Sequence, residues 1–103
     1  MRIPGDQTDT RHREAEIAAT VRRYVVDEFL FGTGEVDGRA SLLESGTIDS
    51  TGIVDLAMWL EVHFGIEIGD EDMTTANLDS VERIARFVAR REAASNPGDR
   101  RLE

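Results

Sequence analysis

Apolar residues recur at intervals of three and four along the first third of the chain, a spacing that predicts an amphipathic helix over residues 13 to 30. The face that we expect to be buried consists of Ile17, Val21, Tyr24, Val25 and Phe29. The sequence FGTGEVDG then interrupts the pattern, and four glycines between residues 32 and 46 indicate a long loop. We expect Leu42 and Leu43 to anchor that loop to the core.

A second helix is predicted from Asp49 or Ser50 to Phe64, with Gly65 as the residue that ends it. At 100° per residue, one stripe of this helix is expected to face the core. The stripe consists of Ile53, Leu56, Ala57, Leu60 and Phe64.

The same helix carries a second apolar stripe on roughly the opposite side, formed by Val54, Met58 and Val62 with Thr51 beside them. A helix of a soluble monomer seldom has two apolar faces unless one of them binds a partner. The alternative is that Met58 or Val62 packs beneath the long loop. Trp59 falls between the two stripes, where it either packs against the loop or contributes to docking.

After this helix, the link IEIGDED is expected to direct Ile66 and Ile68 inward. Thr74 or Thr75 can cap a single helical turn that ends near Leu78. A last helix is predicted from Ser80 to about Arg91. Its buried residues are expected to be Val81, Ile84, Ala85 and Val88, and its solvent-facing residues Arg83, Arg86 and Arg90. No segment alternates with a period of two, so the pattern predicts a small all-α bundle of three main helices, one short helix and one long loop.

The two ends of the chain are polar, lack helical periodicity and contain both prolines. We therefore expect flexible tails at residues 1 to 12 and 93 to 103, and a single folded domain over residues 13 to 92. No apolar run approaches the roughly 20 residues that span a bilayer, and the first residues do not resemble a signal peptide. These features favour a cytoplasmic protein with no membrane contact.

The net charge of −9 is concentrated in the middle of the chain. Residues 27 to 82 contain fourteen acidic residues and a single basic one, Arg39. A segment this acidic repels nucleic acid and anionic lipid, so its partners are expected to present basic surfaces. The alternative is that the charge only keeps a small monomer soluble.

Catalysis by the chain itself is not expected. A nucleophilic Ser50 needs a base about 2.6 to 3.2 Å away. His63 lies thirteen residues further along the same predicted helix, about 20 Å away, and His12 lies in the expected tail. The absence of cysteine excludes disulfides and thiolate metal sites.

The three successive acids at residues 70 to 72 raise the possibility of a calcium site. They lack the alternating acids, the glycine and the terminal glutamate of a calcium-binding loop. We expect weak cation binding at most, and no metal site.

The dipeptide Asp-Ser occurs twice, each time before a predicted helix. Ser80 is interpreted as a helix N-cap. Ser50 lies at the start of its helix, where unpaired backbone N–H groups and the helix dipole stabilise a phosphate, while Asp49 can cap the helix. Ser50 is therefore the candidate for a phosphate-linked modification.

The stretch GTIDSTGIVDL resembles the phosphopantetheine attachment site of acyl carrier proteins, and the resemblance extends to the end of the last helix. It implies a four-helix bundle with a long first loop and a short third helix. It also implies that Ser50 carries 4′-phosphopantetheine derived from coenzyme A, and that Asp49 takes part in recognition by the phosphopantetheinyl transferase. The thiol of that arm would hold acyl groups as thioesters, so a chain without cysteine could still perform thiol chemistry.

Two residues depart from the usual pattern of this family. Thr51 replaces the common leucine or methionine, and Asp55 replaces the commoner glutamate. The first change bears on which partner enzymes recognise the protein, more than on whether the arm is added. The residues expected to dock those enzymes are Thr51, Val54, Asp55, Met58, Glu61 and Val62.

The leading hypothesis is a carrier protein, not an enzyme, that is modified at Ser50. Its expected partners are the transferase, an acyl or aminoacyl loading ligase, and downstream transferases with basic docking surfaces. Fatty acyl, aminoacyl and polyketide cargoes all remain open, although the absence of a doubled glycine before Ser50 disfavours peptidyl carriers. The alternative is an unmodified acidic helical adaptor that binds a basic partner protein.

Overall fold

The computed structural model describes residues 5 to 94, with side chains from Thr10 onward. It contains the helices α1 (Gly5–Phe29), α2 (Ser50–Phe64), α3 (Thr75–Leu78) and α4 (Val81–Ala94), and a single 3-10 turn, η1 (Asp70–Asp72). No strand occurs in this part of the chain. The predicted all-α architecture, a four-helix bundle with a long first loop and a short third helix, is confirmed.

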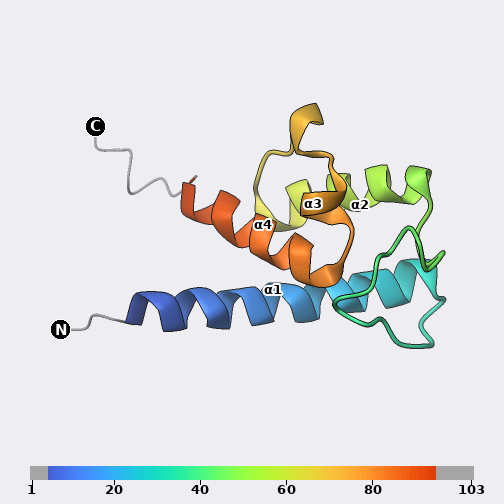
Figure 1. Cartoon of the computed structure of the whole chain (residues 1–103), viewed down its shortest axis with the longest axis horizontal. Coiled ribbons are helices and arrows are strands. Elements are labelled where there is room, and N and C mark those ends of the chain that lie inside the picture. The colour runs from blue at the N-terminus through green and yellow to red at the C-terminus, as the bar shows by residue number, and fades with distance from the viewer. Residues whose placement is uncertain (1–4, 95–103) are drawn as a thin grey trace.

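The other helices lie on one side of α1, which packs most extensively against α4 (Figure 1). The long loop after α1 returns the chain to the same end of the molecule, where α2 begins (Figure 1). Among these described residues, no helix has the length and apolar character needed to cross a membrane.

The core lies where α1, α2 and α4 meet. Its fully buried residues include Ile17, Val21, Val25, Leu56, Leu60, Ile84 and Val88, all of them predicted from helical spacing. Burial of each such side chain contributes about 1.5 to 3 kcal/mol. Tyr24 and Phe29, also predicted for this face, are only partly buried.

The predicted start of the first helix at residue 13 was wrong, since α1 already begins at Gly5. The extra turns run beside the end of α4, where Arg13 forms a two-pronged ion pair with Glu92: Nε to Oε1 at 2.9 Å and a terminal guanidinium nitrogen to Oε2 at 2.6 Å. Polar contacts of this kind leave no apolar periodicity, so the pattern could not reveal them. Ala93 and Ala94, assigned to the second tail, are still helical, while residues 1 to 4 and 95 to 103 of the two expected tails lie outside the described residues.

The ends of the other helices follow the sequence closely. Gly65 ends α2 with a left-handed φ of 68°, and its N–H donates to the Glu61 carbonyl. Thr74 precedes α3 as expected, although its side chain makes no capping hydrogen bond. In α4 the four predicted core residues are buried, together with Phe87, which the spacing argument omitted.

The acidic run at residues 70 to 72 forms η1, and Asp72 has a structural role there. Its carboxylate accepts a hydrogen bond from the Gly69 N–H and pairs with Arg91 of α4. The Gly69 hydrogen bond, followed by the Arg91 contact, lowers the pKa of Asp72 below its ordinary value. Among the side chains that the structure describes, no group of three potential ligands is arranged to hold a metal ion.

We predict opposite outcomes for two alanine substitutions on α2. Leu60 is 0% exposed and Val62 is 85% exposed. Leu60→Ala should therefore lower the free energy of unfolding by about 2 to 5 kcal/mol, whereas Val62→Ala should change it by less than about 0.5 kcal/mol. Urea denaturation followed by circular dichroism measures both, and equal losses would show that the two faces of α2 have been assigned wrongly.

Candidate functional site

Ser50 is the first residue of α2, and its side chain is exposed. The helix is capped by the residue before it, because Asp49 Oδ1 accepts a hydrogen bond from the Gly52 N–H at 2.8 Å. Within residues 5 to 94, no hydrogen bond engages the Ser50 hydroxyl. Asp49 therefore pairs with a backbone N–H group at the start of the helix, and the Ser50 hydroxyl remains available to an external group.

The electrostatic environment of Ser50 suits a phosphate. The first N–H groups of α2 point out of the helix end, and the dipole of this 15-residue helix is positive there. An anion bound to Ser50 Oγ would lie against that positive end. An exposed hydroxyl at a capped helix N-terminus thus fits a phosphate-linked prosthetic group.

Gly52 seats the first turn of α2 against the end of α1. A Cβ atom added at Gly52 would lie 2.7 Å from Ile48 Cγ2 and 2.9 Å from Phe29 Cε1. Both distances are shorter than ordinary van der Waals contact. The absence of a side chain at Gly52 is what allows the serine-bearing turn to approach Phe29.

The second Asp-Ser pair lies in a different environment. Ser80 is only 3% exposed, and its Oγ accepts a hydrogen bond from the Arg83 N–H at 3.1 Å. The predicted role of Ser80 as the N-cap of α4 is therefore confirmed. Its buried and occupied hydroxyl is poorly placed for modification.

Asp79 fastens the long loop to the junction between α3 and α4. Its carboxylate accepts hydrogen bonds from Ser41 Oγ at 2.6 Å and from the Leu43 N–H at 3.2 Å. Its backbone carbonyl also accepts a hydrogen bond from the Leu42 N–H at 2.7 Å. Sequence reasoning missed this residue, because its partners lie almost forty positions earlier in the chain.

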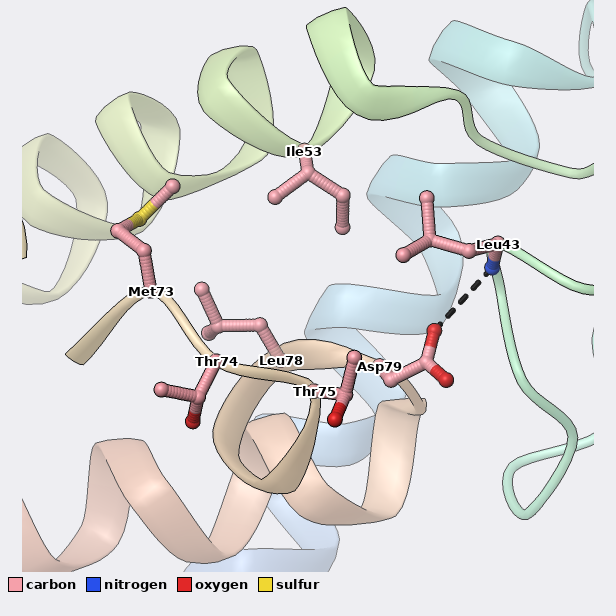
Figure 2. Close-up of a pocket in the computed structure, with 7 residues that line it drawn as sticks. All are labelled: Leu43, Ile53, Met73, Thr74, Thr75, Leu78 and Asp79. Carbon is pink, nitrogen blue, oxygen red and sulfur yellow. Dashed lines mark hydrogen bonds between the residues drawn. The ribbon is translucent and has the colours of Figure 1, made fainter. Parts of the chain in front are cut away.

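A pocket of about 80 Å³ lies between α2, α3 and the loop. Figure 2 shows Ile53, Leu43 and Leu78 directed toward it, with the Asp79 carboxylate at its edge. Ile53 lies one helical turn after Ser50. The expectation that both leucines anchor the loop was half right, because Leu42 is buried in the core while Leu43 lines this pocket and is partly exposed.

The second apolar stripe of α2 lies on the surface. Met58 is 58% exposed, and Val54 and Val62 are exposed as well. The alternative in which Met58 or Val62 packs beneath the loop is wrong. Thr51 and Asp55 are exposed on the same helix.

Glu61 differs from the other five expected docking residues. Its side chain is partly buried, and Oε2 accepts a hydrogen bond from the Ile68 N–H at 2.8 Å. This contact gives Glu61 a structural role in holding the link that follows α2.

Trp59 belongs to the interface between α1 and α2. Its ring stacks on Tyr24 of α1 with centroids 4.0 Å apart, and on His63 with centroids 4.8 Å apart. The sequence left open whether Trp59 packs against the loop or contributes to docking. The structure instead places it against α1, where stacking and burial help to hold the two helices together.

Comparison with known proteins agrees with this geometry. A sequence profile of the family described as "Phosphopantetheine attachment site" matches residues 19–88. The chain is 33% identical over 81 residues to an acyl carrier protein of Thermosynechococcus vestitus, covering 79% of this chain and 98% of that protein. It is 34% identical over 56 residues to an acyl carrier protein of Solidesulfovibrio magneticus, covering 54% of this chain and 72% of that protein.

The chain therefore belongs to the acyl carrier protein family, whose prosthetic group is 4′-phosphopantetheine.

We predict that Gly52→Ala destabilises the protein although alanine is the better helix former. The added methyl group meets Phe29 and Ile48, and such overpacking costs about 1 to 3 kcal/mol. Thr51→Ala is the matched control, since Thr51 is exposed on the same turn. Thermal unfolding should show a lower midpoint for Gly52→Ala and an unchanged or slightly higher midpoint for Thr51→Ala. A midpoint for Gly52→Ala at or above that of the wild type would show that the two helices are not in close contact there.

Proposed function

We propose that Ser50 carries the 4′-phosphopantetheine arm, and that the protein holds acyl groups on it as thioesters and presents them to partner enzymes. The observation that carries this proposal is the exposed hydroxyl of Ser50 at the capped start of α2, which has no hydrogen-bond partner among residues 5 to 94. The thiol at the end of the arm supplies the thioester chemistry that a chain without cysteine lacks. The protein itself acts as a carrier and not as a catalyst.

Attachment requires a bond between Ser50 Oγ and the phosphate of the arm, so the modifying enzyme must reach that oxygen from outside. The environment favours the product as well, because the positive end of α2 stabilises the phosphate. Asp49 holds the first turn in shape through its hydrogen bond to Gly52. We propose that the transferase recognises Asp49 together with Ser50.

The partner enzymes are proposed to dock on the exposed apolar stripe of α2. Val54, Met58 and Val62 provide apolar area there, and Asp55 adds negative charge. A complementary enzyme surface combines apolar contacts with basic side chains. Opposite charges also speed the encounter, so association should slow as salt rises.

The pocket lined by Ile53 of α2 suggests which acyl groups the protein could shelter. Its volume of about 80 Å³ is well below the roughly 150 Å³ of a cavity that accepts benzene. Leu43, Ile53 and Leu78 give it mainly apolar walls. We propose that a short acyl group fits this pocket, whereas a long chain extends beyond it. An aminoacyl group held on the same arm would rely on the enzyme that loads it for its selection.

Attachment is tested by incubating the protein with coenzyme A, magnesium and a broad-specificity phosphopantetheinyl transferase. The wild-type protein should gain the mass of one arm, and Ser50→Ala should gain none. Ser80→Ala is the matched control: it should still be modified, but should lose about 0.5 to 2 kcal/mol of stability with its helix cap.

Two outcomes of this experiment would overturn the proposal. A wild-type protein that gains no mass, under conditions that modify another carrier protein, would favour the unmodified adaptor. A mass gain that persists in Ser50→Ala would place the arm on another residue.

Docking is tested by placing a positive charge on the exposed stripe. Met58→Arg should leave the melting temperature nearly unchanged, because the side chain is exposed. It should lower kcat/KM for modification by about tenfold, since it removes apolar contact and repels a basic partner. Ala19→Arg is the matched control, because it adds the same charge at an exposed position of α1. Equal losses in both variants would indicate an effect of net charge, and would contradict docking at Met58.

A further inference from the structure

Phe31 is an unusual residue for the fold to place in solvent. It lies two residues after the end of α1, and its side chain is 91% exposed. Its φ of 58° makes it the one described residue other than glycine in the left-handed region. A bulky residue seldom adopts this conformation, which carries a cost in backbone strain.

The fold has no visible need of this side chain. The backbone completes the end of α1, since the N–H groups of Leu30 and Gly32 both donate to the Val26 carbonyl, at 3.0 and 2.9 Å. Leu30 supplies the apolar contact with the core. Glycine at residue 31 would adopt the same φ without strain and would expose no aromatic ring.

Phe31 lies at the same end of the molecule as Ser50. Phe29 contacts Gly52 at the junction of α1 and α2, and Figure 1 shows the end of α1 beside the start of α2. Phe31 and Ser50 are each two residues along the chain from that contact. Two residues span at most about 7 Å, so Phe31 and Ser50 both lie near this junction of α1 and α2.

The charges around Phe31 are almost all negative. Asp27 and Glu28 precede it, Glu35 and Asp37 follow it, and all four are exposed. The first basic residue after it is Arg39. An apolar ring on a segment rich in carboxylates is complementary to an apolar pocket bordered by basic side chains.

We propose that Phe31 is a docking residue for the phosphopantetheinyl transferase that modifies Ser50, and that its ring enters an apolar pocket of that enzyme bordered by basic residues. This inference rests on the proposed attachment at Ser50. The transferase is the partner singled out because it must bring its active site to Ser50 Oγ itself. Enzymes that act on the far end of the arm can dock at a greater distance.

If the proposal is correct, substitutions of Phe31 should affect thermal stability and the rate of Ser50 modification differently. Phe31→Gly and Phe31→Asn both suit the left-handed backbone, so each should keep or raise the melting temperature. Each should also lower kcat/KM for modification of Ser50 by about tenfold or more, as expected for loss of an aromatic anchor. Phe31→Tyr keeps the ring and should retain the rate to within about twofold.

The experiment measures initial rates of modification with a purified phosphopantetheinyl transferase and coenzyme A, and thermal unfolding by circular dichroism. Glycine makes the loop more flexible than asparagine does. If both variants lose the same fraction of the modification rate, the loss is due to the missing ring and not to a more flexible loop. Wild-type rates in the glycine and asparagine variants would overturn the proposal and leave attachment at Ser50 standing. A rate for Phe31→Tyr as low as for Phe31→Gly would also overturn it. Failure of the wild-type protein to be modified would remove the proposed function and this inference together.

Discussion

The close contact between Gly52 and Phe29 positions the functional end of the molecule. It seats the first turn of α2 on the last turn of α1, because glycine leaves room for the Phe29 ring. That contact places the start of α2 against α1, and Asp49 caps the helix while Ser50 remains exposed. The ring of Phe31 is held at the same end, since it follows Phe29 by two residues. The positions of Ser50 and Phe31 therefore both depend on the absence of a side chain at Gly52.

The two Asp-Ser pairs show how environment, and not sequence alone, decides the chemistry of a serine. At the start of α2 the aspartate caps the helix, and no residue in the described part of the chain bonds to the serine hydroxyl. At the start of α4 the roles are exchanged: Ser80 caps the helix, while Asp79 turns back to hold the long loop. The same dipeptide is therefore a surface site at the start of α2 and a buried structural contact at the start of α4.

Features set by local patterns could be predicted from the sequence, whereas features set by distant contacts could not. The bounds of α2 followed from its apolar period and from Gly65, and the exposure of Met58 followed from the same period. The start of α1 at Gly5 has no apolar period to mark it, and the nearby Arg13–Glu92 ion pair joins α1 to a helix far along the chain. The role of Asp79 could not be predicted either, because its hydrogen-bond partners lie far away in the sequence. The full exposure of Phe31 depends on how the loop leaves α1, which no periodicity describes.

Attachment of the phosphopantetheine arm to the exposed serine of α2 can be tested on the wild-type protein. After enzymatic modification, proteolysis and tandem mass spectrometry locate the modified side chain. We expect the arm on Ser50 alone. An arm found on Ser41, Ser45 or Ser80 would contradict it, because the structure gives the hydroxyl of each of these serines a hydrogen-bond partner.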